Sequence, residues 1–150
     1  MEVRVAEKTR GSHRTVTKRV LNEALFSHSC PAAMTRFRFQ NLSYRCSGIW
    51  IGTGAGSTGA MRSAGGEQFP ANSRWLQAII RESYEDPEAP VGAPRCTMSH
   101  EDGTFVLKSM TDEATLYLDG PHMQVPIWYE NRMIFRIGEP LRLVVPDGRE

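Results

Sequence analysis

Gly52-Thr53-Gly54-Ala55-Gly56-Ser57-Thr58-Gly59 opens a stretch of mostly small residues that continues to Gly66. It follows the short apolar run Ile49-Trp50-Ile51. A segment with so little side-chain volume contributes little to a hydrophobic core. It can instead bring backbone N–H groups and hydroxyls close to a polar, phosphate-bearing ligand. The sequence therefore predicts a ligand-binding loop that directly follows a β-strand.

Two common phosphate-binding patterns fit this loop poorly. The GxxxxGK[ST] pattern requires a lysine after its glycines, and none follows here. The dinucleotide fingerprint GxGxxG does match residues 54–59. That fingerprint also needs a helix of several turns and an acidic residue about 20 positions further on. Gly65 and Gly66 interrupt such a helix, and the region from Ser73 to Leu76 contains no carboxylate.

The loop resembles the nucleotide-binding signature of the NAD kinase family, a strand followed by T-x-x-G-S-T-A-x-x-x-S-x-G-G. Its characteristic positions are occupied by Thr53, Gly56, Ser57, Thr58, Ser63, Gly65 and Gly66. The variant around Ala60-Met61 is similar to the plant-type NADH kinase branch. The alternative is a glycine-rich surface loop without function. The joint match of glycines and hydroxyls favours the nucleotide-binding interpretation.

A second candidate site is the pair Asn22-Glu23, which interrupts the apolar run from Val20 to Phe26. In isolation such a pair is typical of a strand end or a turn. Inside a strand it needs hydrogen-bond partners, because burying polar groups unpaired costs a few kcal/mol. The run resembles the A-L-N-E/D-V-x-I strand of the same family. We therefore expect Asn22 and Glu23 to contact the nucleoside of a bound nucleotide.

Three further segments, at residues 29–37, 73–82 and 116–120, resemble the family in the same order, so the resemblance covers nearly the whole chain. It implies a mainly β (α+β) fold: the β-sandwich-like C-terminal domain of the NAD kinase fold, with one or two short helices. We expect residues 1–150 to form one domain equivalent to that nucleotide-binding half. The family's N-terminal α/β half carries a Gly-Gly-Asp-Gly loop, which these residues lack. The nearest candidate, Glu101-Asp102-Gly103, has no preceding glycines.

The resemblance implies an NAD(H) kinase that uses ATP and Mg²⁺ to phosphorylate the adenosine ribose 2′-hydroxyl of NAD or NADH, in the pathway that makes NADP(H). It implies nucleotide contacts from Asn22, Glu23 and the hydroxyl loop, and assembly into homo-oligomers. No catalytic base is assigned among these residues, so the chain is interpreted as a fragment of the full enzyme. Two alternatives stay open: a non-catalytic NAD(P)(H)-binding module, and a β-rich interaction domain that binds no nucleotide.

Composition narrows the classes of protein further. The chain has 150 residues, 40% of them hydrophobic and 23% charged, which suits one globular domain. A formal net charge of +1 argues against a nucleic-acid or membrane partner held by bulk electrostatics. The sequence contains no run of 18 apolar residues, so it predicts no membrane-spanning helix. Partners are therefore expected to be a dinucleotide and ATP, without nucleic acid or membrane.

The cysteines and histidines do not suggest a metal site or a disulfide framework. Cys30, Cys46 and Cys96 are odd in number and widely spaced, which favours reduced thiols in a cytoplasmic location. The four histidines are also far apart, and structural zinc normally uses paired ligands at short spacings. No metal ligands are predicted.

Alternation and turn residues predict a chain of short strands with one helix. The helix is expected from Arg74 to Glu82, capped by Ser73, with a basic N-terminal hairpin turning at Gly11-Ser12 and an exposed loop from Glu82 to Pro94. Strands are expected at residues 2–6, 15–26, 35–39, 44–51, 105–109, 114–118, 123–128, 133–137 and 141–145.

Overall fold

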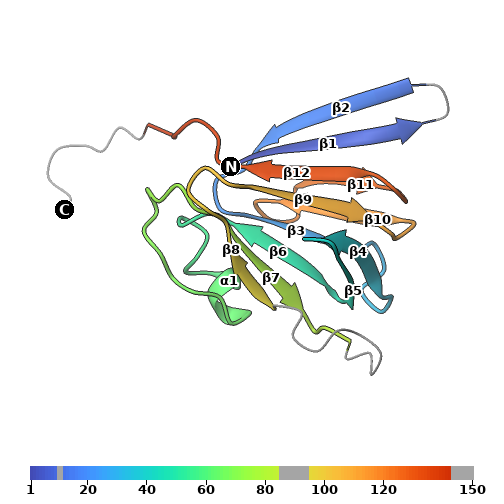
Figure 1. Cartoon of the computed structure of the whole chain (residues 1–150), viewed down its shortest axis with the longest axis horizontal. Coiled ribbons are helices and arrows are strands. Elements are labelled where there is room, and N and C mark those ends of the chain that lie inside the picture. Colours follow the sequence, from blue (N-terminus) through green and yellow to red (C-terminus); the bar gives the residue numbers. More distant parts are fainter. Residues whose placement is uncertain (10–11, 85–94, 143–150) are drawn as a thin grey trace, which may run out of the picture.

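The computed structural model describes residues 1–9, 12–84 and 95–142. These residues form two antiparallel six-stranded sheets and one short helix, α1 (Ala60–Ser63) (Figure 1). In spatial order, the strands of the first sheet are β2 (Ser12–Arg19), β1 (Glu2–Thr9), β12 (Arg132–Arg136), β9 (Thr104–Ser109), β4 (Thr35–Phe39) and β5 (Leu42–Cys46). Those of the second sheet are β11 (Met123–Ile127), β10 (Ala114–Leu118), β3 (Glu23–His28), β6 (Gly48–Gly52), β7 (Gln77–Arg81) and β8 (Cys96–Met98).

The hydrophobic core lies between the two sheets, because alternate residues of each strand point inward. Strand β4, for example, alternates buried Thr35, Phe37 and Phe39 with exposed Arg36 and Arg38. The second sheet contributes inward residues that are almost fully buried. Both sheets supply side chains to one continuous cluster, which includes Val3, Phe37, Phe105, Leu107, Phe135, Ala24, Phe26, Ile49, Ile51, Leu116 and Ile127. The predicted mainly β, sandwich-like fold with a short helix is confirmed.

Two predicted long strands are each divided where the chain crosses between the sheets. The run 15–26 becomes β2 in the first sheet and β3 in the second, with a break at residues 20–22. The run 44–51 becomes β5 and β6, with Ser47 between them. Apolar residues occur on both sides of each break because both halves contribute side chains to the same core. Because of the break at residues 20–22, Asn22 lies directly before the first residue of β3.

The helix predicted from Arg74 to Glu82 is wrong. Residues 77–81 form β7, which pairs with β6 on one side and β8 on the other. Ala78 and Ile80 join the core between the sheets, while Ile79 is buried on the opposite face of the strand. A strand covered on both faces has a continuous apolar run, and its periodicity does not distinguish it from a buried helix. Trp75, which precedes β7, is 40% exposed.

Three other predictions are only partly covered by the described residues. The N-terminal hairpin is confirmed by the pairing of β1 with β2, whereas Gly11 of its expected turn lies outside the described residues. Residues 85–94 of the expected loop also lie outside them. Of the strand expected at 141–145, residues 141–142 are not in a strand and the remainder is not described. Within the described ranges, no helix has the length and apolar character needed to cross a bilayer.

Candidate nucleotide-binding site

The glycine-rich segment leaves the end of β6 and covers the outer face of the second sheet (Figure 1). Met61, in α1, is fully buried, and its side chain lies about 3.0 Å from the point where a Cβ on Gly52 would stand. A Cβ on Gly66 would lie 2.4 Å from Ile79 Cδ1 and 2.3 Å from Gln77 Oε1. Small residues at 52 and 66 are therefore required for the segment to lie flat on β6 and β7. The loop is anchored at both ends by packing.

The middle of the loop is in direct contact with the Asn22-Glu23 pair. A Cβ on Gly56 would lie 2.5 Å from the Asn22 backbone oxygen and 2.8 Å from Glu23 Oε2. The Thr53 N–H donates to the Asn22 oxygen at 2.9 Å, and Thr53 Oγ1 donates to the Leu21 oxygen at 2.7 Å. Two segments predicted separately, and more than 30 positions apart in the sequence, thus lie in contact with each other.

The hydroxyl residues of the loop divide into two groups. Thr53 and Ser57 are buried, and their hydroxyls hold the loop together: Ser57 Oγ donates to the Gly54 oxygen at 2.7 Å and accepts the Phe69 N–H at 3.2 Å. Thr58 is exposed, so its hydroxyl faces solvent where a ligand can reach it. Ser63 is exposed at the end of α1, and its Oγ donates to the Gly59 oxygen at 3.3 Å.

An open hollow lies beside the loop. Gly54, Ala55 and Thr58 form one wall, and residues 68–71 form the other. The second wall includes Phe69 and Pro70, which sequence reasoning did not select. A partly buried aromatic beside backbone N–H groups can contact a base or ribose while the N–H groups contact phosphate. A lone Phe-Pro pair in a polar stretch carries no signal strong enough to reveal this from the sequence.

Asp119, at the end of β10, orients the Asn22-Glu23 pair. Its two carboxylate oxygens accept the N–H groups of Leu21 and Asn22, each at 2.7 Å. The Asp119 N–H in turn donates to the Glu23 oxygen at 3.0 Å. These bonds fix the backbone at the point where the chain enters β3. The Asp119-Gly120 turn was part of the sequence resemblance, but pairing across 97 positions could not be read from it.

The carboxylate of Glu23 lies in an unfavourable electrostatic environment. Partial burial raises its pKa above the ordinary value, and the nearby Asp119 carboxylate raises it further. An elevated pKa at a half-buried carboxylate beside a loop of N–H donors is typical of a functional site. Among the described residues, no group of three or more His, Cys, Asp or Glu side chains could hold a metal ion by itself.

Comparisons with known proteins show which proteins resemble this chain in sequence and in fold. No family model matches the chain. It is 33% identical over 140 residues to a probable NADH kinase of Oryza sativa subsp. japonica. The match covers 85% of the chain and 42% of the rice protein. The chain is thus similar in sequence to plant proteins named NADH kinases. It is also 37% identical over 91 residues to an NADH kinase of Arabidopsis thaliana, covering 57% of the chain and 26% of that relative.

Solved structures show that the fold is that of NAD kinases. The yeast NADH kinase in complex with NADH superposes with a TM-score of 0.68 at 13% identity, over 89% of this chain and 38% of the yeast chain. The NAD kinase of Archaeoglobus fulgidus in complex with ATP gives a TM-score of 0.63 at 19% identity, over 90% and 50% of the two chains. The chain thus spans half or less of the length of these relatives.

Proposed function

We propose that this chain is the dinucleotide-binding part of an NAD(H) kinase, which transfers a phosphoryl group from ATP to the adenosine ribose 2′-hydroxyl of NAD or NADH to give NADP(H). The observation that carries the proposal is the contact between Gly56 and the Asn22-Glu23 pair, which builds one site from the two motifs of the family. Rice and Arabidopsis relatives named NADH kinases support the assignment to this branch.

The residues of the site suggest distinct roles. N–H groups at the exposed side of the loop, together with the Thr58 hydroxyl, would bind phosphate oxygens. Asn22 and Glu23 would hydrogen-bond the nucleoside, since an amide and a carboxylate together match both donors and acceptors of ribose hydroxyls and a base edge. Thr53 and Ser57, whose hydroxyls are used within the loop, would contribute by holding its shape.

The phosphoryl-transfer step places further requirements on the site. Such reactions depend on positioning the nucleophile and neutralising charge on the transferred group, which a Mg²⁺ bound to ATP phosphates supplies. Mg²⁺ commonly takes one or two protein carboxylates plus phosphate oxygens. Among the described residues, no group of three or more His, Cys, Asp or Glu side chains could hold such an ion, so the ATP phosphates would supply most of its ligands. The carboxylate that would activate the ribose hydroxyl belongs to the Gly-Gly-Asp-Gly loop of the family, which these residues do not contain.

A non-catalytic NAD(P)(H)-binding module is the second candidate, and the missing Gly-Gly-Asp-Gly sequence favours it for these residues taken alone. An assay with ATP, Mg²⁺ and NADH that follows NADPH, run in parallel with NADH calorimetry, separates the two. Binding without turnover supports the module for this chain. Turnover by the chain alone would show that the carboxylate of the missing loop is not essential. Absence of both would contradict the proposed function. We further propose a reducing, cytoplasmic location, which the free cysteines Cys30, Cys46 and Cys96 support.

A further inference from the structure

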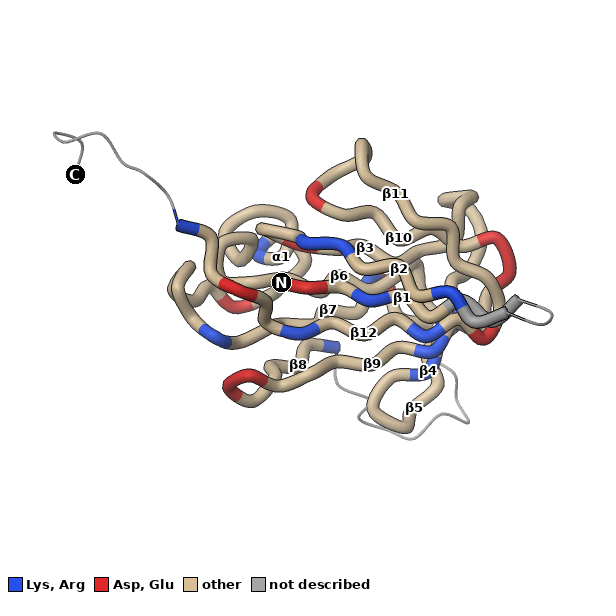
Figure 2. Tube along the Cα trace, turned by 90° about the horizontal axis from the view of Figure 1, so that it is seen from above, with Lys and Arg blue, Asp and Glu red and all other residues tan. Residues whose placement is uncertain are grey.

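The outer face of the first sheet is strongly basic. Its strands alternate inward core residues with outward polar ones, and the register brings the outward residues of neighbouring strands together. Blue segments of β12, β9 and β4 lie near one another in Figure 2. Among the described side chains of these strands, Glu2 is the acid on this face. The cations on this face are Arg4, Arg19, Arg36, Arg38, Arg45, Lys108, Arg132 and Arg136.

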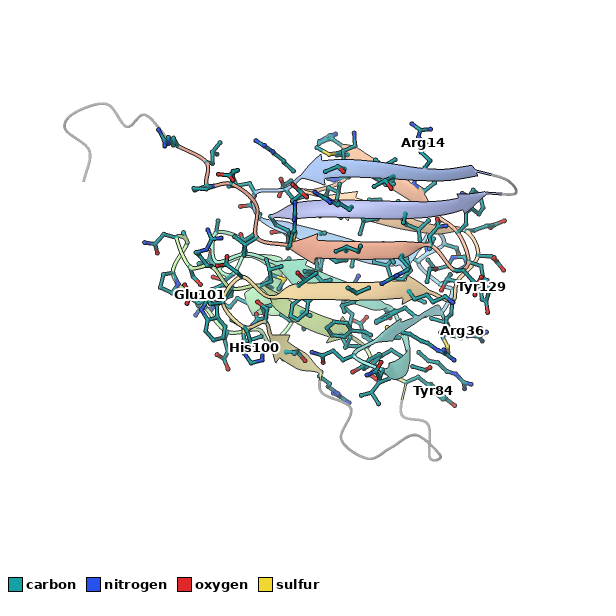
Figure 3. All side chains as sticks on the ribbon, turned by 45° about the horizontal axis from the view of Figure 1, so that its top comes forward. Arg14, Arg36, Tyr84, His100, Glu101 and Tyr129 are labelled. Atoms are coloured by element: carbon teal, nitrogen blue, oxygen red, sulfur yellow. The ribbon has the colours of Figure 1, made fainter. Side chains whose placement is uncertain are left out.

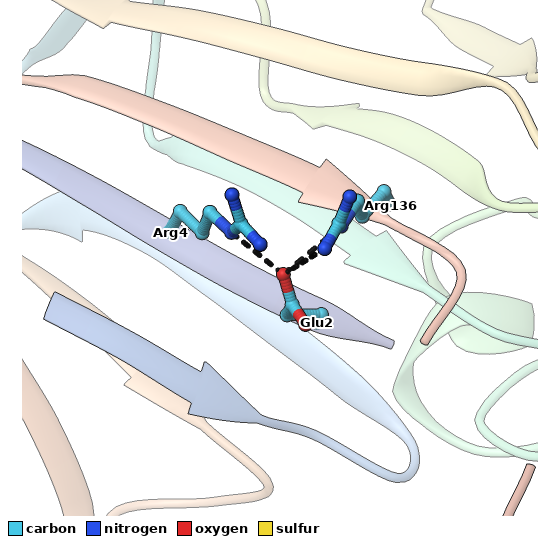
Figure 4. Close-up of polar contacts among 3 residues, drawn as sticks. All are labelled: Glu2, Arg4 and Arg136. Atoms are coloured by element: carbon cyan, nitrogen blue, oxygen red, sulfur yellow. Dashed lines mark hydrogen bonds and ion pairs between the residues drawn. The ribbon is translucent and has the colours of Figure 1, made fainter. Parts of the chain in front are cut away.

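Glu2 neutralises one end of this face. Its Oε1 accepts a bond from Arg4 Nε at 2.7 Å and another from Arg136 Nη2 at 2.7 Å (Figure 4). These bonds lower the pKa of the Glu2 carboxyl, that from Arg4 most strongly. One carboxylate therefore serves two guanidinium groups. Glu2 does not neutralise the positive charges at the other end of the face, on β4, β9 and β12.

At that other end three cations stand directly opposite one another. Lys108 pairs in register with Arg132 on one side and with Arg38 on the other. Lys108 Nζ lies 2.7 Å from Glu130 Oε1, whereas Arg38 and Arg132 have no acidic partner among the described residues. Like charges directly opposite on neighbouring strands destabilise a sheet. An anion bound across the row would offset that cost.

A groove opens over the same row. It has a volume of about 770 Å³, and Arg38, Lys108, Arg132 and His100 line it together with Ser43 and Ser99. Its rim at the β4–β5 turn is well defined, because Gln40 and Asn41 both have left-handed backbone conformations, with φ of 49° and 63°. His100 lines the groove and lies on the opposite side of the molecule from Arg36, which does not line it (Figure 3). A volume of this size suits a small molecule.

We propose that this groove binds a small molecule that carries two or more linked phosphate groups. Guanidinium groups bind phosphate oxygens through paired, charge-assisted hydrogen bonds. Strands lie about 4.8 Å apart, so the row Arg132–Lys108–Arg38 extends over about 10 Å, more than a single phosphate requires. The lining shares no residue with the hollow beside the glycine loop. The groove is therefore a second anion site, distinct from the proposed dinucleotide site.

The test is a calorimetric titration of the 150-residue chain with inorganic tripolyphosphate at low ionic strength, compared with R38Q, R132Q and R19Q. Arg19 lies on the same face but on β2, outside the groove, so R19Q removes the same charge. We expect R38Q and R132Q each to weaken binding at least about tenfold, and R19Q less than about twofold. In phosphate-free buffer, R132Q should melt no lower than the wild type, because it relieves like-charge repulsion.

Several results would overturn this proposal. Absence of tripolyphosphate binding would do so, as would equal losses in R19Q and R132Q, which would indicate general charge attraction. If R38Q and R132Q leave binding unchanged while G56A abolishes it, the phosphate chain binds at the glycine loop. A melting temperature of R132Q well below that of the wild type would assign Arg132 a structural role instead. NADH binding should be the same in R38Q, R132Q and the wild type, which keeps this test separate from that of the proposed function.

Discussion

The backbone oxygen of Asn22 lies 2.5 Å from the point that a Cβ on Gly56 would occupy. At Gly59, three positions further along the loop, the nearest atom to the corresponding point is 4.0 Å away. The site is therefore closed at one glycine and open at the next. This difference provides a matched pair of variants.

Gly56→Ala should lower the free energy of unfolding by about 1–3 kcal/mol, because the added methyl group forces the loop away from β3. Gly59→Ala meets no close neighbour and should cost less than about 1 kcal/mol. Urea unfolding of the two variants and the wild type measures both values. Equal costs would mean that the contact between loop and strand is not as tight as the structure shows.

Asp119→Asn should destabilise the protein by about 1 kcal/mol, because an amide offers one oxygen where the carboxylate accepts two N–H groups. Asp112→Asn, on an exposed turn, is the control and should change stability by less than about 0.5 kcal/mol. If Asp119 acts on the site through Asn22, D119N should also weaken NADH binding while D112N does not. Thermal unfolding and calorimetry on the same samples check both expectations.

The raised pKa of Glu23 predicts a pH-dependent effect with a definite sign. A carboxyl whose folded pKa is raised contributes stability that is full below the unfolded pKa of about 4.3 and is lost as pH rises through the folded pKa. The melting temperature of Glu23→Gln should therefore rise relative to that of the wild type as the pH increases from 4 to 7.

Glu2→Gln serves as the control of opposite sign. The pKa of Glu2 is lowered by Arg4 and Arg136, so its contribution is present above the unfolded pKa and is lost as pH falls through the folded pKa. The melting temperature of this variant should fall relative to the wild type over the same interval. If the two curves had slopes of the same sign, at least one of the two assignments would be wrong.

The three cysteines should differ in reactivity toward a thiol reagent at pH 8. Burial raises the pKa of the Cys46 thiol to about 12, and it raises the pKa of Cys96 as well. Cys30 is exposed and should react first. Mass spectrometry of the labelled peptides should show Cys46 modified only after unfolding. Fast labelling of Cys46 in the native protein would show that the core between the sheets opens readily.

Much of the fold could be predicted from alternation, because strands such as β4 and β12 alternate buried residues with more exposed ones. The region from Arg74 to Glu82 could not, since β7 is covered by the core on one side and by the glycine loop on the other. That loop hides Ile79 from solvent, and local periodicity contains no information about a segment that packs over it. A buried helix and a buried strand would have the same apolar run here. Pairing with β6 and β8 determines that the segment is a strand.

The site shows a similar limit. Residue types pointed to Asn22, Glu23 and the loop, since polar residues in apolar runs and dense glycines are visible locally. The role of Asp119 and the wall formed by Phe69 and Pro70 depend on contacts between distant segments. The division of the hydroxyls, with Ser57 buried and Thr58 exposed, also follows from the path of the loop rather than from the residue type.

The most direct test of the central claim is a calorimetric titration of NADH into the wild-type chain, G56A and G59A, all shown to be folded under the conditions used. The wild type and G59A should bind NADH with similar affinity, and G56A should bind at least about tenfold more weakly, because the methyl group displaces the loop from Asn22 and Glu23. Equal NADH affinity in all three proteins would show that the dinucleotide does not bind where the loop meets β3.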